Sequence, residues 1–221
     1  MNELNNLDQA RFNMVEQQIR PAEVLDPHVL SVIEKTPRDA FVAEKYKGLA
    51  FADTHIPIND QEVMMTPIQE ARMLQALNLR QSDTVLEIGT GSAYLTALLA
   101  QQTRQVTSVE IEPSLAEAAK KRLAAQKIDN ITLEIGDGSK GWPKEDGYDV
   151  IAVTGSMPKL ADELKNQLTV GGRLCVIVGT EPVMEFLLIT RISDSQWQEE
   201  CLFETLLPKL KNVDLPPEFV F

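Results

Sequence analysis

The pattern of apolar and polar residues between positions 84 and 99 predicts a strand, a turn and a helix in direct succession. Thr84 to Ile88 form a short β-branched and apolar run, which is typical of a buried strand. Gly89 and Gly91 break this run, and leucines then recur between Leu95 and Leu99 with the spacing of one helix face. Glycines in this place let the backbone turn sharply and let a ligand approach the main chain where the helix begins.

The rest of the core alternates between strands and helices. Strand-like runs are Val106–Ile111, Ile131–Ile135, Tyr148–Val153, Arg173–Val178, Val183–Ile192 and Glu200–Leu207, and helical runs are Ser114–Lys127 and Pro158–Leu168. This alternation predicts an α/β fold with a doubly wound, mostly parallel sheet of seven strands. The last three strands follow one another without a helix, so we expect the sheet to finish with an antiparallel element.

A helical extension precedes this core. Phe12, Val15 and Ile19 mark one amphipathic helix, and Asp26 caps a second helix that begins at Pro27. No internal repeat is visible. We therefore expect a single domain, residues 1–221, with an N-terminal helical segment (1–80) and an α/β core that binds the ligand (81–221).

The net charge limits the classes of partner. The 221 residues carry a formal net charge of -12, and an acidic surface repels polyanions, so we expect no nucleic-acid partner. The most basic stretch, Lys120 to Arg122, is interpreted as the solvated face of a helix.

Cysteine usage and the N-terminus indicate the compartment. Cys175 and Cys201 lie in predicted strands without the spacing of a metal site, so we expect buried, reduced thiols and no metal. Met1 to Asn5 lack the basic and apolar regions of a signal peptide, and no apolar run approaches the roughly 18 residues of a membrane span. These features predict a cytoplasmic protein without membrane contact.

Acidic residues beside the glycine turn indicate a nucleoside ligand. A dinucleotide site would have a third glycine where this chain has Tyr94, which weakens that interpretation. Glu87 lies two residues before Gly89, and Glu110 ends the next predicted strand. Because the carboxyl ends of parallel strands lie side by side, Glu110 can accept hydrogen bonds from both hydroxyls of a ribose over the turn. Glu110 can also cap the helix that follows it.

The pattern Glu-x-Gly-x-Gly-x-Ala at Glu87 to Ala93 resembles the first motif of S-adenosylmethionine-dependent methyltransferases. Over nearly its whole length the chain is similar to the protein-L-isoaspartate (D-aspartate) O-methyltransferase family, which methylates the abnormal carboxylate of isoaspartyl residues in damaged proteins. The segments that carry this resemblance are Val24–Leu25, Thr36–Arg38, Phe41–Val42, Gly48–Ala50, Pro57–Ile58, Val85–Leu99, Gly136–Gly138, Gly141–Trp142, Tyr148–Asp149, Gln167–Leu168 and Gly171–Leu174. The resemblance implies a Rossmann-like class I methyltransferase fold, S-adenosylmethionine as cofactor and a peptide or damaged-protein carboxylate as methyl acceptor.

The resemblance also assigns cofactor-binding residues, which are Glu87, Gly89, Gly91, Ser92, Glu110, Asp137 and Gly138. The first four would line the methionine part and the sulfonium, Glu110 would bind the ribose, and Asp137 beside Gly138 would meet the adenine amino group. Since Asp-Gly is a common turn pair, a plain turn is the alternative for the last two. The N-terminal segment would then lie on the acceptor side of the cofactor.

The chain departs from the family pattern near the expected acceptor. The family has a serine two residues before the proline that opens the helix after Pro57–Ile58, and this register gives Met65. A hydroxyl follows one position later at Thr66, which is the candidate catalytic residue if the register shifts locally. Thr66 also forms a capping box with Gln69 ahead of Pro67, so its alternative role is that of a helix cap.

The implied chemistry needs no general base. A carboxylate has an ordinary pKa of roughly 3.3 to 4.3 and is already an anion at neutral pH. The two histidines, His28 and His55, lie outside the motifs and are expected to be structural. Two alternatives stay open: a methyltransferase of the same fold with a different acceptor, and a cofactor-binding protein without transfer activity.

Overall fold

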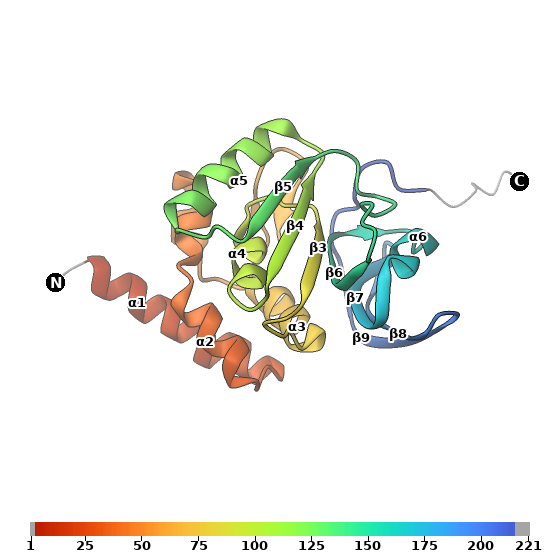
Figure 1. Cartoon of the computed structure of the whole chain (residues 1–221). Coiled ribbons are helices and arrows are strands. Elements are labelled where there is room, and N and C mark those ends of the chain that lie inside the picture. Colours follow the sequence, from red (N-terminus) through yellow and green to blue (C-terminus); the bar gives the residue numbers. More distant parts are fainter. Residues whose placement is uncertain (1–2, 215–221) are drawn as a thin grey trace, which may run out of the picture.

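The computed structural model describes residues 3–214. Residues 1–2, which begin the N-terminal stretch considered above, and residues 215–221 lie outside this range. The described residues form a central sheet with helices on both faces and a helical N-terminal segment on one side (Figure 1).

The main sheet has seven strands in the order β5-β4-β3-β6-β7-β8-β9. The strands are β3 (Thr84–Ile88), β4 (Gln105–Glu110), β5 (Ile131–Ile135), β6 (Tyr148–Met157), β7 (Leu168–Thr180), β8 (Val183–Ser193) and β9 (Gln196–Thr205). The five strands β3 to β7 run parallel to one another, and β8 is antiparallel to both of its neighbours. The predicted doubly wound, mostly parallel sheet with an antiparallel finish is therefore confirmed.

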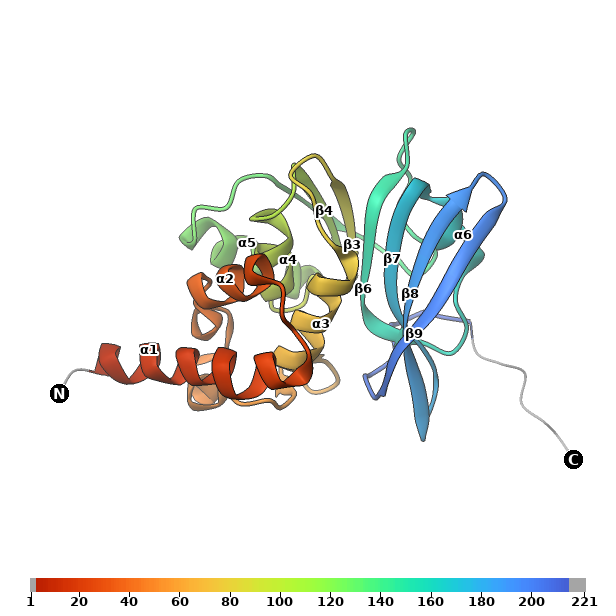
Figure 2. The same ribbon diagram turned by 90° about the horizontal axis from the view of Figure 1, so that it is seen from below.

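The helices lie unequally on the two faces. The helices are α1 (Glu3–Met14), α2 (Pro27–Lys35), α3 (Pro67–Leu77), α4 (Tyr94–Ala100), α5 (Pro113–Ala125) and α6 (Asp162–Asn166). Helices α1 to α5 gather on one side of the sheet and α6 lies on the other (Figures 1 and 2). The short helical turns η1 (Val15–Ile19), η2 (Arg20–Ala22), η3 (Arg38–Phe41) and η4 (Glu44–Leu49) and the hairpin strands β1 (Ile56–Pro57) and β2 (Val63–Met64) complete the N-terminal segment.

Strand β3 lies inside the sheet, between β4 and β6, and both of its faces are covered. All five of its residues are buried. Val85 packs into the apolar cluster on the side of α3 and α4, whereas Leu86 and Ile88 pack into the cluster on the other face. Side chains alternate between the faces of a strand, so Glu87 points to the same side as Val85, toward α4. The alternation fixes where this carboxyl group lies.

The N-terminal helix differs from its prediction. Helix α1 ends at Met14 and continues as five residues of π-helix, η1. Val15 and Ile19 are buried as expected, but the Phe12 side chain is 49% exposed. A π-helix bonds residue i to i+5 and so changes the rotation per residue. Residues before and after the transition therefore do not share one face.

The segment after Val153 also differs. The predicted strand ends at Val153, yet β6 continues to Met157. After a shift in register, Ser156 and Met157 pair with Ile177 and Val178 of β7, and the Ser156 N–H donates to the Pro208 carbonyl (3.0 Å) from far along the chain. The helix predicted over 158–168 shortens to α6, since Leu168 already pairs with Tyr148 as the first residue of β7.

The cysteines divide between two environments. Cys175 is completely buried, as predicted. Cys201 is exposed, and its predicted burial is wrong. It lies on β9, which ends the sheet and has no further strand or helix over this side chain among the described elements.

Candidate active site

Glu87 lies in the middle of the sheet with one oxygen unpaired. Its side chain is completely buried. Oε2 accepts hydrogen bonds from the hydroxyls of Thr96 on α4 and Ser108 on β4, both at 2.6 Å, whereas Oε1 has no partner among the described residues. Burial raises the pKa of Glu87 to about 8, although the two hydroxyls oppose this shift. A ligand that brings a donor or a positive charge would satisfy the free oxygen.

The turn after β3 needs glycine at Gly89. Its φ is +93°, and a β-carbon there would collide with the hydroxyl of Thr154 on β6. That hydroxyl donates to the carbonyls of Ile88 (2.9 Å) and Gly89 (2.6 Å). Gly91, also at positive φ, donates its N–H to Glu110 Oε2 (2.8 Å). Because the two glycines have no side chains, the backbone of the turn is accessible to a ligand.

Glu110 joins three segments at the end of β4. Besides the Gly91 contact, its Oε1 accepts the N–H of Glu112 (3.0 Å) at the start of α5. Its carbonyl accepts the N–H of Gly136 (2.9 Å) after β5. The alternative role at the start of the following helix is thus part of the structure. Each carboxylate oxygen offers about two acceptor positions, so both oxygens can accept a further donor.

Asp137 lies at the same edge of the sheet, directly after β5. Its Oδ1 accepts the N–H of Ser139 and its Oδ2 accepts from Asn212 Nδ2, both at 2.9 Å. Burial opposes ionisation, but these hydrogen bonds outweigh it and hold the pKa of Asp137 below its ordinary value. Gly138 lies against Ile88, where a β-carbon would come within 2.8 Å of Cδ1. The close approach explains glycine at this position.

Apart from Glu87, these groups line one cleft at the carboxyl ends of β3, β4 and β5, the edge where open α/β sheets bind ligands. The cleft holds about 700 Å³ of space, open solvent at its mouth included. Its walls include Gly89, Gly91, Glu110, Asp137 and Gly138, together with apolar side chains from β4, α5 and the β1–β2 hairpin.

A segment after β9 covers the cleft, which the sequence pattern does not reveal. Leu207 and Leu210 line the cleft, and Ser156 anchors them by accepting the Leu210 N–H (2.9 Å) and donating its hydroxyl to the Leu207 carbonyl (2.7 Å). Lys211 then bridges Glu62 (3.0 Å) and Glu112 (2.5 Å) at the rim. These contacts join residues that lie from about fifty to about 150 positions apart in the chain.

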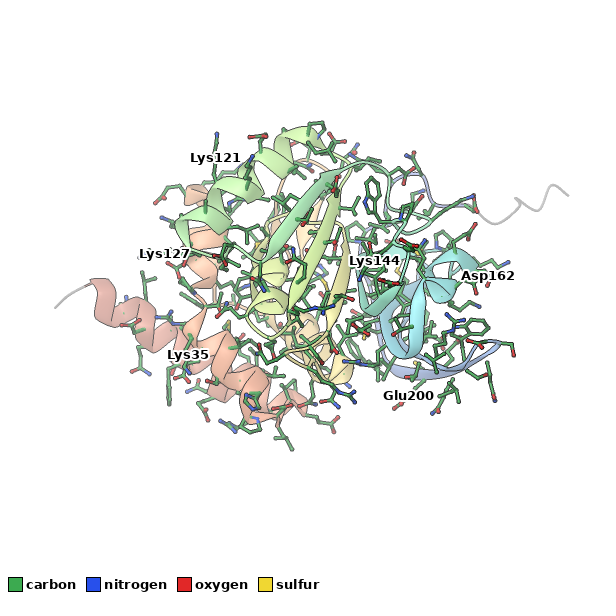
Figure 3. The ribbon with its side chains drawn as sticks, viewed as in Figure 1. Lys35, Lys121, Lys127, Lys144, Asp162 and Glu200 are labelled. Atoms are coloured by element: carbon green, nitrogen blue, oxygen red, sulfur yellow. The ribbon has the colours of Figure 1, made fainter. Side chains whose placement is uncertain are left out.

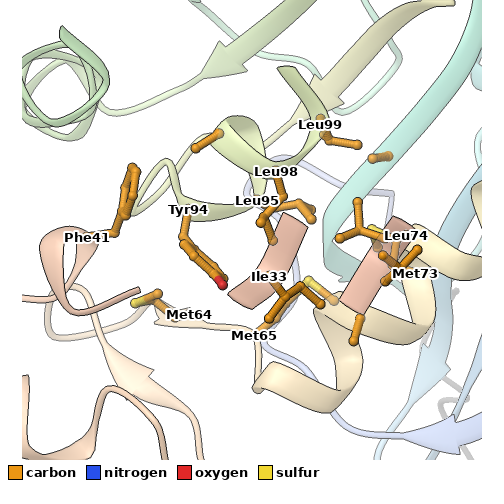
Figure 4. Packing of buried hydrophobic residues seen from close by; sticks show 14 of the residues in the cluster. Ile33, Phe41, Met64, Met65, Met73, Leu74, Tyr94, Leu95, Leu98 and Leu99 are labelled. Atoms are coloured by element: carbon orange, nitrogen blue, oxygen red, sulfur yellow. The ribbon is translucent and has the colours of Figure 1, made fainter. Parts of the chain in front are cut away.

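A smaller inner hollow continues from the glycine turn toward the N-terminal segment. Gly89, Gly91, Ile58, Val63 and Thr154 border both spaces. The inner hollow is lined further by Met64, Met65, Glu70, Glu87, Thr90, Ser92 and Leu95. Figure 4 shows Met64 and Met65 packed near Tyr94 and Leu95 at the start of α4. The predicted residues Glu87, Gly89, Gly91 and Ser92 therefore meet in one place.

A sequence model of the protein-L-isoaspartate(D-aspartate) O-methyltransferase family matches residues 9–209. The chain belongs to this family. A protein-L-isoaspartate O-methyltransferase from Rhodopseudomonas palustris is 40% identical to it, over 86% of this chain and 87% of that protein.

Solved structures agree on the fold. A protein-L-isoaspartate O-methyltransferase superposes with a TM-score of 0.79 at 24% identity, over 91% of this chain and 66% of that longer chain. A β-aspartate methyltransferase from Plasmodium falciparum, solved with S-adenosyl-L-homocysteine, has a TM-score of 0.76 at 19% identity, over 91% of this chain and 98% of that chain. The predicted family, the class I methyltransferase fold and the enzyme class, an S-adenosylmethionine-dependent methyltransferase, are confirmed.

The cleft of this methyltransferase fits S-adenosylmethionine chemically. Glu87 offers an unpaired buried acceptor, Glu110 retains acceptor positions beside the glycine turn, and Gly89 leaves the backbone accessible. Asp137 offers acceptor oxygens at the opposite end of the same cleft. The roles assigned to the individual residues stay predictions.

The structure places Thr66 outside both spaces. Its Oγ1 accepts the Gln69 N–H (3.3 Å), and Gln69 Oε1 accepts the Thr66 N–H (2.8 Å), which completes the capping box at the start of α3. Thr66 borders a separate hollow with His55 and Thr205. The residue of this segment that does line the inner hollow is Met65. A role for the Thr66 hydroxyl in the reaction therefore stays a prediction, without support from its position.

The remaining polar candidates lie away from the cleft. His28 is exposed, and His55 Nε2 lies 3.0 Å from Gln69 Oε1. Lys121 projects from the outer side of α5 (Figure 3), whereas Arg122 is half-buried and donates to the Ser92 carbonyl (3.3 Å). Residues 3–214 contain no group of three or more His, Cys, Asp and Glu side chains placed to hold a metal ion. In the same range, no helix combines the length and the apolar character that a bilayer crossing requires.

Proposed function

We propose that this chain methylates the free carboxylate of isoaspartyl residues in peptides or damaged proteins. The observation that carries the proposal is the position of Glu87, Glu110 and Asp137 around one glycine turn at the ends of three adjacent strands, in a chain of this family. S-adenosylmethionine, when bound, supplies a methyl group that is electrophilic because it is attached to a sulfonium.

The cofactor-binding residues divide the cleft into three parts. Glu87 and the bare turn at Gly89 and Gly91 would hold the methionine end, which places the sulfonium beside the inner hollow. Glu110 would accept the ribose hydroxyls, and Asp137 would accept the adenine amino group. At Asp137 the amide of Asn212 already occupies one oxygen, so adenine would share or displace that contact.

The protein's own task in this reaction is to position the acceptor and exclude water. No histidine lines the two spaces within residues 3–214, and an acceptor that is already an anion needs no base. Ile58, Val63, Met64 and Met65 are apolar side chains of the N-terminal segment that line the inner hollow beside the carboxyl group of Glu70. Alignment of an anionic oxygen with a methyl group next to apolar side chains lowers the barrier through orientation and removal of water.

One observation favours a second candidate, a methyltransferase of the same fold with a different acceptor. Met65 stands where the family pattern has serine, its side chain is 4% exposed, and it lines the inner hollow. A thioether cannot donate a hydrogen bond. An acceptor that needs a hydroxyl donor at this point would be disfavoured, and a more apolar acceptor would be favoured.

The test measures transfer of labelled methyl groups from S-adenosylmethionine to an isoaspartyl peptide and to the matched aspartyl peptide. We expect transfer to the isoaspartyl peptide alone. Gly89→Ala serves as the loss-of-binding control, because a side chain there would collide with Thr154. Calorimetry with S-adenosylhomocysteine runs on the same preparations.

Each outcome separates the candidates. Binding of S-adenosylhomocysteine without transfer to either peptide contradicts the isoaspartyl assignment and favours another acceptor, or a binding protein without transfer activity. Absence of binding contradicts the assignment of the cleft itself. Transfer to both peptides would show an enzyme that does not distinguish the abnormal linkage.

A further inference from the structure

The inner hollow contains a second buried carboxyl group that the family resemblance does not assign. Glu70, on the first turn of α3, is 3% exposed and lines the hollow together with Glu87. The two side chains come from opposite sides of the space, one from the N-terminal segment and one from the sheet. The glycine turn and apolar side chains of the β1–β2 hairpin line the same space.

Arg38 holds Glu70 in place. Its guanidinium is completely buried and donates to Glu70 Oε2 (2.7 Å), to the Met65 carbonyl (2.7 Å) and to the Ala50 carbonyl (3.0 Å). It also lies over the ring of Tyr94, 4.9 Å from the ring centroid. Such a multiply bonded arginine has little freedom to move, so the carboxyl group of Glu70 has a defined position at the wall of the hollow.

The charges around the hollow do not balance. With both carboxyl groups ionised, the two carboxylates and the one guanidinium would leave one negative charge, and no lysine or arginine is among the residues that line this space. Burial raises the pKa of Glu70 to about 8 even though Arg38 opposes the shift, and the charge of Glu87 raises it further. Glu87 Oε1 has no partner among the described residues. A buried charge is costly without a counter-charge, so the site favours a ligand group that carries one positive charge and several N–H donors.

We propose that Glu70 and Glu87 together bind the primary ammonium group at the amino-acid end of S-adenosylmethionine, with Arg38 as the positioning residue. The inference rests on the proposed function for the identity of its ligand. An ammonium group has three donors and one positive charge, which matches two carboxylates facing one space. The hollow begins at Gly89 and Gly91, where the amino-acid end is expected. Glu70 is thus a specificity residue for the amino-acid end of the cofactor.

The test uses three ligands and calorimetry, so it does not depend on methyl transfer. S-adenosylhomocysteine carries the ammonium group, its des-amino analogue lacks that group and keeps the carboxylate, and methylthioadenosine lacks the whole amino-acid end. We expect Glu70→Gln to weaken S-adenosylhomocysteine by about tenfold, the effect of losing one charge-assisted hydrogen bond. Affinity for methylthioadenosine should stay within about twofold.

The des-amino analogue shows whether the effect passes through the ammonium group. In the unmodified protein, the des-amino analogue should bind much more weakly than S-adenosylhomocysteine. In Glu70→Gln, the ratio of these two affinities should be about tenfold smaller. The matched control is Glu117→Gln, an exposed glutamate on α5, which should leave all three affinities unchanged. If Glu70→Gln does not fold, Glu70→Asp keeps the charge near Arg38 but withdraws it from the hollow, and the same pattern is expected.

Three results would overturn the inference. They are an unchanged affinity for S-adenosylhomocysteine in both Glu70 variants, an equal loss for S-adenosylhomocysteine and methylthioadenosine, or the same cost of ammonium removal with and without Glu70. Failure of the unmodified protein to bind either thioether would instead contradict the proposed function. Binding of methylthioadenosine by a Glu70 variant therefore distinguishes a wrong assignment of Glu70 from a wrong assignment of the cleft.

Discussion

Replacement of Glu87 by glutamine tests whether the raised pKa of this buried carboxyl group makes the free energy of unfolding depend on pH. The side chain is completely buried, and burial raises its pKa to about 8 from an ordinary 4.5. Below the ordinary value the carboxyl group is protonated in both states, so its contribution to folding is fully present. As pH rises further, the unfolded chain loses the proton first, while the folded chain retains it until pH passes about 8. Stability must therefore fall across this window.

The magnitude follows from the number of protons that differ between the two states. One proton of difference changes the free energy of unfolding by about 1.4 kcal/mol per pH unit. Between about pH 5.5 and about pH 7.5, both inside the window, the unmodified protein should lose roughly 2 to 3 kcal/mol relative to Glu87→Gln. Glutamine keeps an oxygen for the hydroxyls of Thr96 and Ser108 and does not titrate.

Urea unfolding at the two pH values measures this difference directly. Glu70 titrates in the same direction and is coupled to Glu87, so the difference between the slopes reports the loss of Glu87 together with the change that this loss causes at Glu70. Glu117→Gln, on the exposed side of α5, is the control for a change of net charge alone. Parallel pH profiles of the unmodified protein and Glu87→Gln would refute the reasoning, because Glu87 would then titrate alike in the folded and unfolded states.

Three further predictions follow from single contacts. Glu110→Ala should weaken S-adenosylhomocysteine by at least about tenfold in calorimetry, since two charged hydrogen bonds are lost, and unchanged affinity would mean that the ribose is bound elsewhere. Thr66→Ala should lower the free energy of unfolding by about 1 kcal/mol through loss of the α3 cap, with stability restored in Thr66→Ser; a large loss of methyl transfer in the folded alanine variant would instead place the hydroxyl at the reaction. A thiol reagent should label Cys201 in the native protein and not Cys175, whose pKa burial raises; labelling of Cys175 without unfolding would contradict its burial.

The features that the sequence pattern predicts well are the local ones. The run Thr84–Ile88, the glycine turn and the following leucines form a buried strand, a tight turn and a buried helix as expected. Parallel strands end on the same side of a sheet, which predicts Glu110 beside the glycine turn. Asp137 and the role of Glu87 follow from the family resemblance, so periodicity and turn chemistry predict the turn and Glu110, and the resemblance adds the rest of the cofactor cleft.

The features that the pattern misses depend on long-range partners. β6 continues past Val153 because Ser156 and Met157 pair with β7, and the segment after β9 binds Ser156 across about fifty residues. Cys201 is apolar enough for a core position, yet no described element covers it at the end of the sheet. Phe12 is exposed because the helix changes locally to a π-helix, so that Phe12 does not lie on the buried face with Val15 and Ile19. None of these causes leaves a periodic signal near the residue that it affects.

Met65 and Glu70 show why the inner hollow is the least predictable part of the site. Read along the chain, methionine replaces an expected hydroxyl and a glutamate lies within an amphipathic helix. In space both residues line one hollow and both bond the same buried guanidinium, Met65 through its carbonyl and Glu70 through its carboxylate. A change of Met65 to serine would remove buried apolar volume, which costs roughly 2 to 5 kcal/mol for comparable core truncations, and would leave Arg38 and Glu70 in place. Arg38 therefore joins Met65 and Glu70 in one buried set of contacts, which no periodic pattern in the sequence predicts.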